Sequence, residues 1–251
     1  MKIILSPAKK MKSDGDFLPP RQAPAFLEQA NQLRRYLQSL SVRQLQQLLT
    51  CNDAIAALNY HRYQTMDLSR HTTPAILAYD GIQYQYMAPQ VFDYDCFDYV
   101  ERYVYILSGL YGVLRPFDGV VPYRLEMQAK LHTDFCSSLY AFWGDRLYRE
   151  VTREDSEILN LASAEYSRTV LKYCKEGDRL VTCKFAELQD GKLLEKGVYV
   201  KMARGEMVRF LAENRITSLE EVSRFDRLGY RYHAEWSDPH TFVFIREPTE
   251  H

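Results

Sequence analysis

Long hydrophobic runs are missing from this 251-residue chain. No stretch approaches the roughly 18 consecutive apolar residues that a membrane-spanning helix needs. The N-terminus enters a short apolar segment directly, without the charged region, the hydrophobic core and the small-residue cleavage site of a secretory signal. These absences lead us to expect a cytoplasmic protein with no membrane partner.

Cysteine and histidine are scarce and poorly spaced for metal chemistry. The five cysteines form no C-x-x-C pair, and the six histidines form neither an H-x-x-x-H nor an H-E-x-x-H motif. We therefore predict no metal site and no cofactor. An odd number of widely spaced cysteines is typical of reduced thiols in a reducing compartment. Cys183 alternates with Val181 and Phe185, so we expect a buried strand residue rather than a reactive thiol.

An excess of charge of either sign is also absent. The chain has 32 lysine and arginine residues against 33 aspartate and glutamate residues, for a formal net charge of -1. A near-neutral chain binds a polyanion only if its basic residues gather on one face. The overall charge therefore neither supports nor excludes a nucleic-acid partner.

Linkers and repeats are missing as well. No Gly/Ser-rich linker, low-complexity tract or repeat of solenoid period divides the chain. A chain of this length with 46% hydrophobic residues can bury a sizeable core. We predict a single domain over residues 1–251.

Helical patterns dominate the first part of the chain. A short strand is predicted at residues 2–5, and a proline-containing loop at residues 6–24. Apolar residues at helical spacing begin at residue 26. Ser41 is placed to start a second helix with a capping box, and Asn52 to cap a third. Together these helices predict a helical layer over approximately residues 25–66.

Strands and helices alternate irregularly after Pro74. Residues 76–79 predict a strand that ends in a turn, and residues 97–106 predict a helix. The further predicted elements are a helix at 139–151, a strand at 158–161, a short helix from 163, a hairpin of 180–188 with 193–200, a helix at 202–214, and a hairpin of 230–236 with 242–246. The alternation is too irregular for a doubly wound sheet, so the predicted fold class is α+β, that is, mixed α/β.

One segment combines glycines, aromatic residues and arginines: LSGLYGVLRP at residues 107–116, followed by VPYRLEM at residues 121–127. Its glycines allow a positive φ or the close approach of a ligand. Arg115 and Arg124 supply rigid N–H donors for phosphate or carboxylate. The segment therefore suggests a site. The alternative is a strand that enters a tight connection, with its arginines solvated or paired internally.

Four other blocks extend the pattern: IILSPAK at residues 3–9, YAFWGD at 140–145, LNLASAEY at 159–166 and KMARGEMVRF at 201–210. In order and spacing, the blocks resemble those of the YaaA family of bacterial peroxide-stress proteins. The resemblance implies a cytoplasmic DNA-binding protein that helps cells to survive hydrogen peroxide. It also implies a basic cleft and a helix-hairpin-helix element.

The predicted cleft gathers residues from the ends of separate strands, where sites commonly assemble. Lys201 and Arg204 lie three residues apart and share one helix face. The predicted phosphate-binding residues are Lys9, Arg115, Arg124, Lys201 and Arg204. The predicted lining residues are Ser6, Gly109, Tyr111, Gly112, Asn160 and Ser163. We expect double-stranded or branched DNA to bind here without sequence preference. The alternative for the helix pair is a solvated surface stripe.

Two carboxylates, Glu126 and Glu165, oppose a purely electrostatic DNA groove unless arginines pair with them. An unpaired carboxylate beside Ser108 and Tyr166 is typical of an active site. The alternative function is therefore an enzyme that acts on a nucleotide or a related phosphorylated small molecule. Its candidate catalytic residues are Glu126, Glu165, Ser108 and Tyr166.

The helix-hairpin-helix element implied by the resemblance fits residues 33–40 and 42–50 in part. The turn between them lacks the glycine that usually exposes backbone N–H groups to phosphate. DNA contact at this turn would depend instead on Arg34, Arg35, Ser41 and Arg43. The alternative is a helical corner that packs against the sheet.

Overall fold

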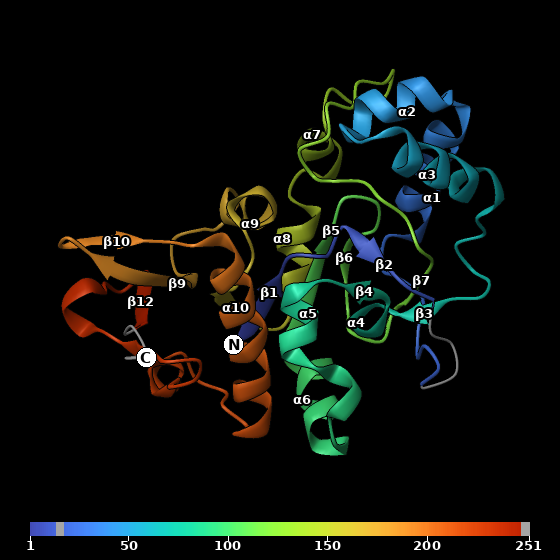
Figure 1. Ribbon diagram of the computed structural model, residues 1–251. Helices are drawn as coiled ribbons and strands as arrows, with labels where there is room; N and C mark the ends of the chain where they lie inside the picture. Colours follow the sequence, from blue (N-terminus) through green and yellow to red (C-terminus); the bar gives the residue numbers. More distant parts are fainter. Residues whose placement is uncertain (14–17, 247–251) are drawn as a thin grey trace.

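A computed structural model of the protein describes residues 1–13 and 18–246. Residues 14–17 of the predicted N-terminal loop and residues 247–251 of the predicted domain lie outside the described residues. A large sheet runs through the molecule with helices packed around it (Figure 1). The predicted mixed α/β class is confirmed.

Within the described residues the main sheet has eight strands, and the five at its centre are parallel. In spatial order these are β12 (Thr241–Arg246), β9 (Arg179–Gln189), β8 (Glu157–Asn160), β1 (Lys2–Leu5) and β5 (Val104–Ser108). Every residue of β1 is buried, as expected of a parallel strand that is covered on both faces. The strand predicted at residues 2–5 is confirmed.

Antiparallel strands complete the sheet. They are β6 (Gly112–Leu114) beside β5, β10 (Lys192–Leu194) beside β9, and β11 (Tyr230–Tyr232) beside β12. Both predicted hairpins therefore form. Two short antiparallel pairs lie outside this sheet: β2 (Lys10–Met11) with β4 (Tyr79–Asp80), and β3 (Thr73–Pro74) with β7 (Gly119–Val120).

The chain changes direction across the sheet between β1 and β8. It passes from β1 to β5 on one side, and later from β8 to β9 on the other. The ends of these two adjacent strands therefore lead into segments that move apart. Open α/β sheets commonly bind ligands outside the carboxyl ends of strands at such a switch point.

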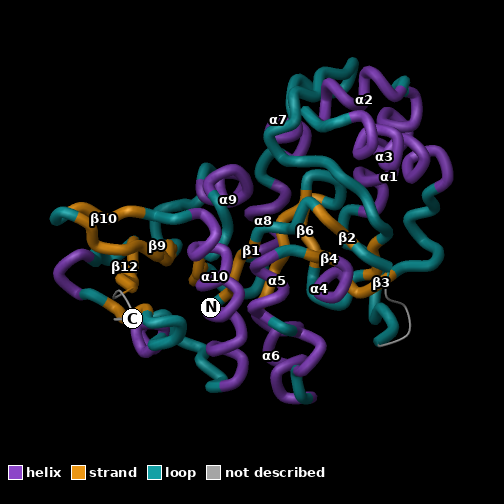
Figure 2. Tube along the Cα trace, in the orientation of Figure 1, coloured by secondary structure: helices purple, strands orange, loops and turns teal. Residues whose placement is uncertain are grey.

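Three helices form the predicted helical layer: α1 (Leu27–Ser39), α2 (Val42–Leu49) and α3 (Asp53–Thr65). They gather at one end of the molecule, away from β9, β10 and β12 (Figure 2). The Ser41 side chain accepts a hydrogen bond from the Gln44 backbone N–H, and Gln44 completes the capping box. Asn52 caps α3 by accepting from the Ile55 N–H. Both predicted caps are confirmed.

The remaining α-helices surround the sheet: α4 (Ala75–Ala78), α5 (Ile82–Met87), α6 (Tyr94–Tyr103), α7 (Leu139–Trp143), α8 (Arg146–Val151), α9 (Ala164–Leu171) and α10 (Gly197–Glu213). Short 3-10 helices span Pro89–Val91, Glu220–Arg224 and Ala234–Trp236. Helices α5 and α10 lie side by side across the front of the view in Figure 1.

Several predicted elements were wrong in type or extent. Residues 76–79 do not form one strand: residues 76–78 end helix α4, and residue 79 begins β4. The prediction was wrong because a short apolar run that is buried on every side shows no periodicity by which a helix could be told from a strand. Residues 104–106 belong to β5 rather than to a helix. Their Val, Tyr and Ile side chains suit a strand, and they pair with β1 in the buried sheet.

Two helices also differ from their predicted bounds. The helix predicted at 139–151 is broken into α7 and α8 at Gly144, which has a φ of 55°. The strand predicted at 193–200 ends at Leu194, and helix α10 begins at Gly197 instead of residue 202. Val198 and Val200 favoured a strand, but packing of α10 against α5 outweighs that local propensity.

Candidate functional site

A cavity of about 510 Å³ opens where β1 and β8 end. We call it the switch-point cavity. Its wall is built from residues 6–10 after β1, residues 80–84 at the start of α5, Glu126, residues Ser163, Glu165 and Tyr166 at the start of α9, and residues Lys201 and Arg204 of α10. A cavity of this size fits a small ligand.

Two serines join the strand ends at the base of this wall. The Ser6 hydroxyl accepts a hydrogen bond from the Ser163 backbone N–H at 2.8 Å and donates one to the Ser163 hydroxyl at 3.2 Å. The Tyr84 hydroxyl donates to the Ser6 carbonyl at 2.9 Å. These bonds fix the relative positions of segments that are 157 residues apart in sequence. Ser6 and Ser163 are thus brought together as predicted.

Four cationic side chains line the cavity: Lys9, Lys10, Lys201 and Arg204. The three lysines are exposed, whereas Arg204 is largely withdrawn from solvent. Burial lowers the pKa of the Arg204 guanidinium. Among the sequence-predicted phosphate-binding residues, the structure therefore places Lys9, Lys201 and Arg204 around one cavity.

Glu126 is held by two cations on the same oxygen. Its Oε1 accepts from Arg124 Nη2 at 2.8 Å and Nε at 3.0 Å, and it lies 3.3 Å from Lys9 Nζ. The Arg124 and Glu126 side chains are 13% and 10% exposed, so the pair is nearly buried. Arg124 thus stands behind the wall of the cavity, where it holds a carboxylate rather than a ligand. The negative charge of Glu126 is therefore compensated by the two cations Arg124 and Lys9.

Glu165 lies in the first turn of α9 and has a different partner. Its Oε1 accepts a hydrogen bond from the Gln128 backbone N–H at 3.2 Å. Burial raises the pKa of the Glu165 carboxyl, and the Glu126 charge adds to the rise. Tyr166 follows it on the same wall, and burial raises the pKa of its phenol well above the ordinary value. The candidate catalytic residues Glu165 and Tyr166 therefore line the same cavity.

The candidate catalytic residue Ser108 and the predicted lining residues Tyr111 and Asn160 are buried and do not line this cavity. Ser108 and Tyr111 are fully buried, and the Ser108 hydroxyl bonds the Tyr123 hydroxyl at 2.6 Å and accepts from the Tyr111 N–H at 2.9 Å. Asn160 donates to Thr182 and accepts from the Ala162 N–H. Their polar groups are satisfied internally, so they do not reach the switch-point cavity.

The glycines of the 107–116 segment serve packing. A Cβ on Gly109 would lie 2.2 Å from the Leu125 carbonyl oxygen, and one on Gly112 would lie 2.7 Å from the Trp143 ring. Gly112 also has a φ of 77°. Close approach is therefore required at both positions, but the approaching group is the protein itself and not a ligand.

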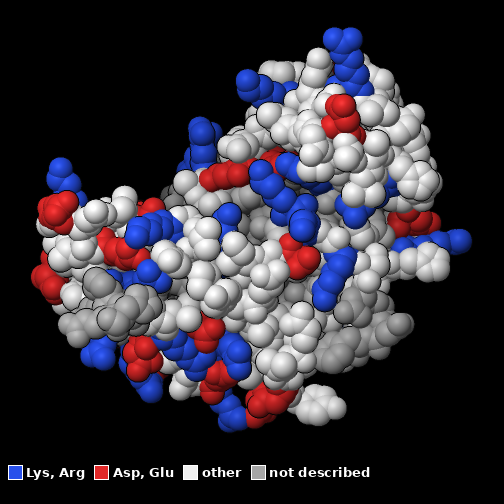
Figure 3. All heavy atoms as spheres, viewed as in Figure 1, with Lys and Arg blue, Asp and Glu red and all other residues white. Residues whose placement is uncertain are grey.

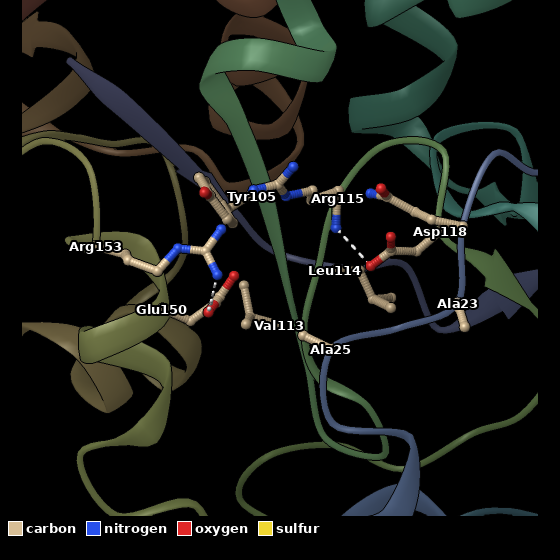
Figure 4. Close-up of a pocket in the computed structure, with 10 residues that line it drawn as sticks. Ala23, Ala25, Tyr105, Val113, Leu114, Arg115, Asp118, Glu150 and Arg153 are labelled. Carbon is tan, nitrogen blue, oxygen red and sulfur yellow. Dashed lines mark hydrogen bonds and ion pairs between the residues drawn. The ribbon is translucent and has the colours of Figure 1, made fainter.

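Arg115 lines a separate pocket, whose wall also includes Glu150 and Arg153 (Figure 4). Its backbone N–H donates to Asp118 at 2.9 Å. Burial raises the pKa of the Asp118 carboxyl to about 7. Of the five predicted phosphate-binding residues, Arg115 is the one that the structure places away from the other four.

The residues predicted for the helix-hairpin-helix element have local roles. Arg34 donates to the side chains of Asn31 and Gln38 on its own helix. Arg35 and Arg43 are exposed, and Ser41 caps α2. None of these residues lines the switch-point cavity. DNA contact at this turn stays a prediction.

Sequence reasoning missed the wall contributed by residues 80–84. Gln83 is buried, and it lines the cavity together with Tyr84 and Asp80. The sequence predicted a turn at Asp80-Gly81, where this part of the wall begins, but it did not indicate that the following residues face a cavity. Figure 3 shows basic and acidic side chains interspersed on this face of the molecule, with a group of basic ones near its middle.

Two further predictions concern thiols and membranes. Cys183 is 2% exposed, and burial raises the pKa of its thiol, so the predicted buried strand residue is confirmed. Within residues 1–13 and 18–246, no helix combines the length and the apolar character that crossing a bilayer requires.

Comparison with known proteins gives a consistent result. A family model described as peroxide stress protein YaaA matches residues 1–236. A UPF0246 protein of Desulfitobacterium hafniense is 65% identical over 250 residues, which cover 100% of both chains. A UPF0246 protein of Lachnoclostridium phytofermentans is 49% identical over 98% of this chain and 96% of its own length, and one of Pediococcus pentosaceus is 46% identical over 98% of each. The chain therefore belongs to the YaaA family of peroxide stress proteins.

Proposed function

We propose that this protein acts in the peroxide-stress response by binding the phosphate backbone of DNA at the mouth of the switch-point cavity. The observation that carries the proposal is the position of three exposed lysines. Lys9 lies in the loop after β1, Lys10 is the first residue of β2, and Lys201 belongs to α10, yet all three line the same cavity. Exposed lysines contact phosphates without reading base sequence.

Three carboxylates line this cavity, those of Asp80, Glu126 and Glu165, and two of them oppose a polyanion only weakly. Glu126 is neutralised by Arg124 and Lys9. Burial raises the pKa of Glu165, which favours its neutral form as pH falls. The positive charges of Lys10 and Lys201 have no carboxylate within ion-pair distance among the described residues. Electrostatic repulsion between these carboxylates and DNA phosphates is thus reduced near Lys10 and Lys201.

The test is DNA affinity as a function of salt. Fluorescently labelled duplex, single-stranded and branched DNA are titrated with the full chain at several salt concentrations. The logarithm of the association constant should fall linearly with the logarithm of salt concentration, with a slope of about -0.9 per phosphate contact on duplex DNA. The double variant Lys10→Ala/Lys201→Ala should bind all duplex sequences more weakly, with a slope that is smaller by about two.

The double variant Lys172→Ala/Lys192→Ala is the matched control. Both residues are exposed lysines, and neither lines the cavity. The control should keep the slope of the original protein. Equal slopes in all three proteins, with folding intact, would contradict binding at the cavity. If the control variant loses as much DNA affinity as the cavity variant, DNA binds to exposed lysines anywhere on the surface and not specifically at the cavity.

A further inference from the structure

Unpartnered polar atoms gather at the switch-point cavity. Five buried side-chain nitrogen or oxygen atoms have no hydrogen-bond partner within the described residues. Three of them, Arg204 Nε, Gln83 Nε2 and Glu126 Oε2, belong to residues that line this one cavity. Buried polar groups are nearly always hydrogen-bonded, so a concentration of exceptions in one place calls for an explanation.

Arg204 is the strongest of the three exceptions. No hydrogen bond or ion pair joins its guanidinium to any described residue. Glu195 acts on it only through longer-range attraction. The Arg204 side chain is half-buried and its Nε is shielded from water, so this N–H group has lost hydration that no hydrogen bond replaces. Its five N–H donors form a rigid fork that matches a phosphate or carboxylate.

The position of Arg204 is fixed by the packing of its helix. The next residue, Gly205, lies so close to α5 that a Cβ there would be 2.0 Å from the Gln83 carbonyl oxygen. This contact holds Arg204 of α10 and Gln83 of α5 at the same wall. Two nitrogen donors from different helices are therefore presented together, with Lys201 one helical turn away at the mouth.

Glu126 contributes an acceptor to the same cavity. Both of its cationic partners, Arg124 and Lys9, bind Oε1, so Oε2 is left without a donor. The side chain is only 10% exposed. A ligand that satisfies all three unpartnered groups needs an anionic group for Arg204 and Gln83, and an N–H or O–H donor for Glu126.

We infer that the switch-point cavity binds a small phosphate monoester that also carries an amino or hydroxyl donor. The wall carries four cationic side chains against the three carboxylates of Asp80, Glu126 and Glu165. Since Arg124 also binds Glu126 from behind the wall, the cations outnumber the carboxylates and favour an anionic group such as a phosphate. The cavity volume of about 510 Å³ lies within the range of small-molecule sites. This inference does not depend on DNA binding, because it concerns the buried groups and not the exposed lysines.

The experiment measures binding of defined probes to the full chain by titration calorimetry. The probes are adenosine 5′-monophosphate and glucosamine 6-phosphate, with adenosine, glucosamine and inorganic phosphate for comparison. At least one of the two phosphate esters should bind more tightly than both its unphosphorylated counterpart and inorganic phosphate. If neither ester binds at millimolar concentration, the inference is wrong.

Three variants locate the site. Arg204→Gln should weaken the bound ester by about tenfold or more, because a buried charge-assisted contact is lost. Glu126→Gln should weaken binding of the ester, because the carboxylate oxygen that would accept from the amino or hydroxyl group of the ester is lost. Lys192→Ala, which removes a cation remote from the cavity, should bind as the original protein does. An ester that binds Arg204→Gln with unchanged affinity overturns the inference.

Thermal unfolding without ligand gives an independent readout. Because Arg204 has no protein partner to lose, Arg204→Gln should unfold at the same temperature as the original protein or higher. A clear fall would show that the guanidinium stabilises the fold, which contradicts its assignment to a ligand. Arg204→Lys, which keeps the charge without the fork, should fold normally and bind the ester with reduced affinity.

Discussion

Two neighbouring strands, β1 and β5, end at the same edge of the sheet with very different results. After β1, residues 6–10 line an open cavity with lysines at its mouth. After β5, the Ser108–Gly112 turn leads directly into β6, and its side chains are buried. Both ends carry a serine and small residues, so the difference does not arise from residue type.

The cause is the path of the chain beyond each strand. The β5 end folds back into the sheet as a hairpin, and the Trp143 indole covers it by donating to the Gly109 carbonyl at 3.1 Å. The β1 end instead faces β8, whose chain departs in the opposite direction. In this protein a cavity forms at the end of β1, where the chain segments after β1 and β8 separate. The end of β5 is buried in the core, because the β5–β6 hairpin and Trp143 cover it.

The largest expected effect lies in the closed region. In Gly109→Ala, the new methyl group must fit where a backbone oxygen, that of Leu125, lies 2.2 Å away. Because backbone atoms cannot rotate aside, we expect a loss of about 3 kcal/mol in the free energy of unfolding, the upper part of the range for overpacked cores. Urea denaturation measures the loss.

Gly197→Ala is the control for Gly109→Ala. A Cβ at Gly197 has no heavy atom within 4 Å, and the position starts helix α10. The free energy of unfolding of Gly197→Ala should rise, by less than about 1 kcal/mol. Similar losses in both variants would mean that the closed region is no more tightly packed than an exposed helix start.

The second prediction uses pH to separate the regions. The pKa of Asp118, in the turn after β6, is raised by burial to about 7, against an ordinary value of 3.8. Between these pH values the folded protein binds a proton that the unfolded chain releases, so stability falls as pH rises. From pH 5 to pH 8 the original protein should lose about 2 to 3 kcal/mol relative to Asp118→Asn.

Urea denaturation of both proteins at pH 5 and pH 8 provides the measurement. Glu165→Gln, at the open cavity, should show a change of the same sign but smaller size, because its carboxylate is less deeply buried than that of Asp118. A stability difference between the original protein and Asp118→Asn that is independent of pH would refute the prediction.

The smallest effect is expected at the open strand end. Ser6→Ala removes the hydroxyl that accepts from the Ser163 N–H at 2.8 Å and donates to the Ser163 hydroxyl at 3.2 Å. Since the site borders a cavity that water can enter, water can replace these bonds, and the cost should be about 1 kcal/mol. Ser108→Ala is the matched variant in the closed region, and it should cost more because both partners of the Ser108 hydroxyl are buried where water cannot replace the lost bonds. Equal costs would contradict the comparison.

Local sequence patterns predicted many elements correctly. The strand at Lys2–Leu5, the capping box at Ser41 and the cap at Asn52 all depend on interactions within a few residues, and such interactions are visible in sequence. The errors at residues 76–79 and 104–106 arose where apolar runs are buried on every side. There tertiary packing chooses between helix and strand.

The candidate site was only partly predictable. The family resemblance, together with strand ends and helical spacing, pointed to Ser6, Lys9, Ser163, Lys201 and Arg204, all of which line the cavity. The same reasoning also chose Ser108, Gly109, Tyr111 and Gly112, which are packed in the core. Polar and glycine residues look alike in sequence whether they face a ligand or another part of the chain.

The sequence by itself determined the family, the mixed α/β class and most of the local elements. Only the tertiary structure decided which arginines meet which partners. Arg124 holds Glu126, Arg115 lies in another hollow, and the Nε of Arg204 is buried without a hydrogen-bond partner within the described residues. The physical reason is distance along the chain. Burial and pairing depend on segments such as Ser6 and Ser163, which sequence separates by 157 residues and the order of strands brings together.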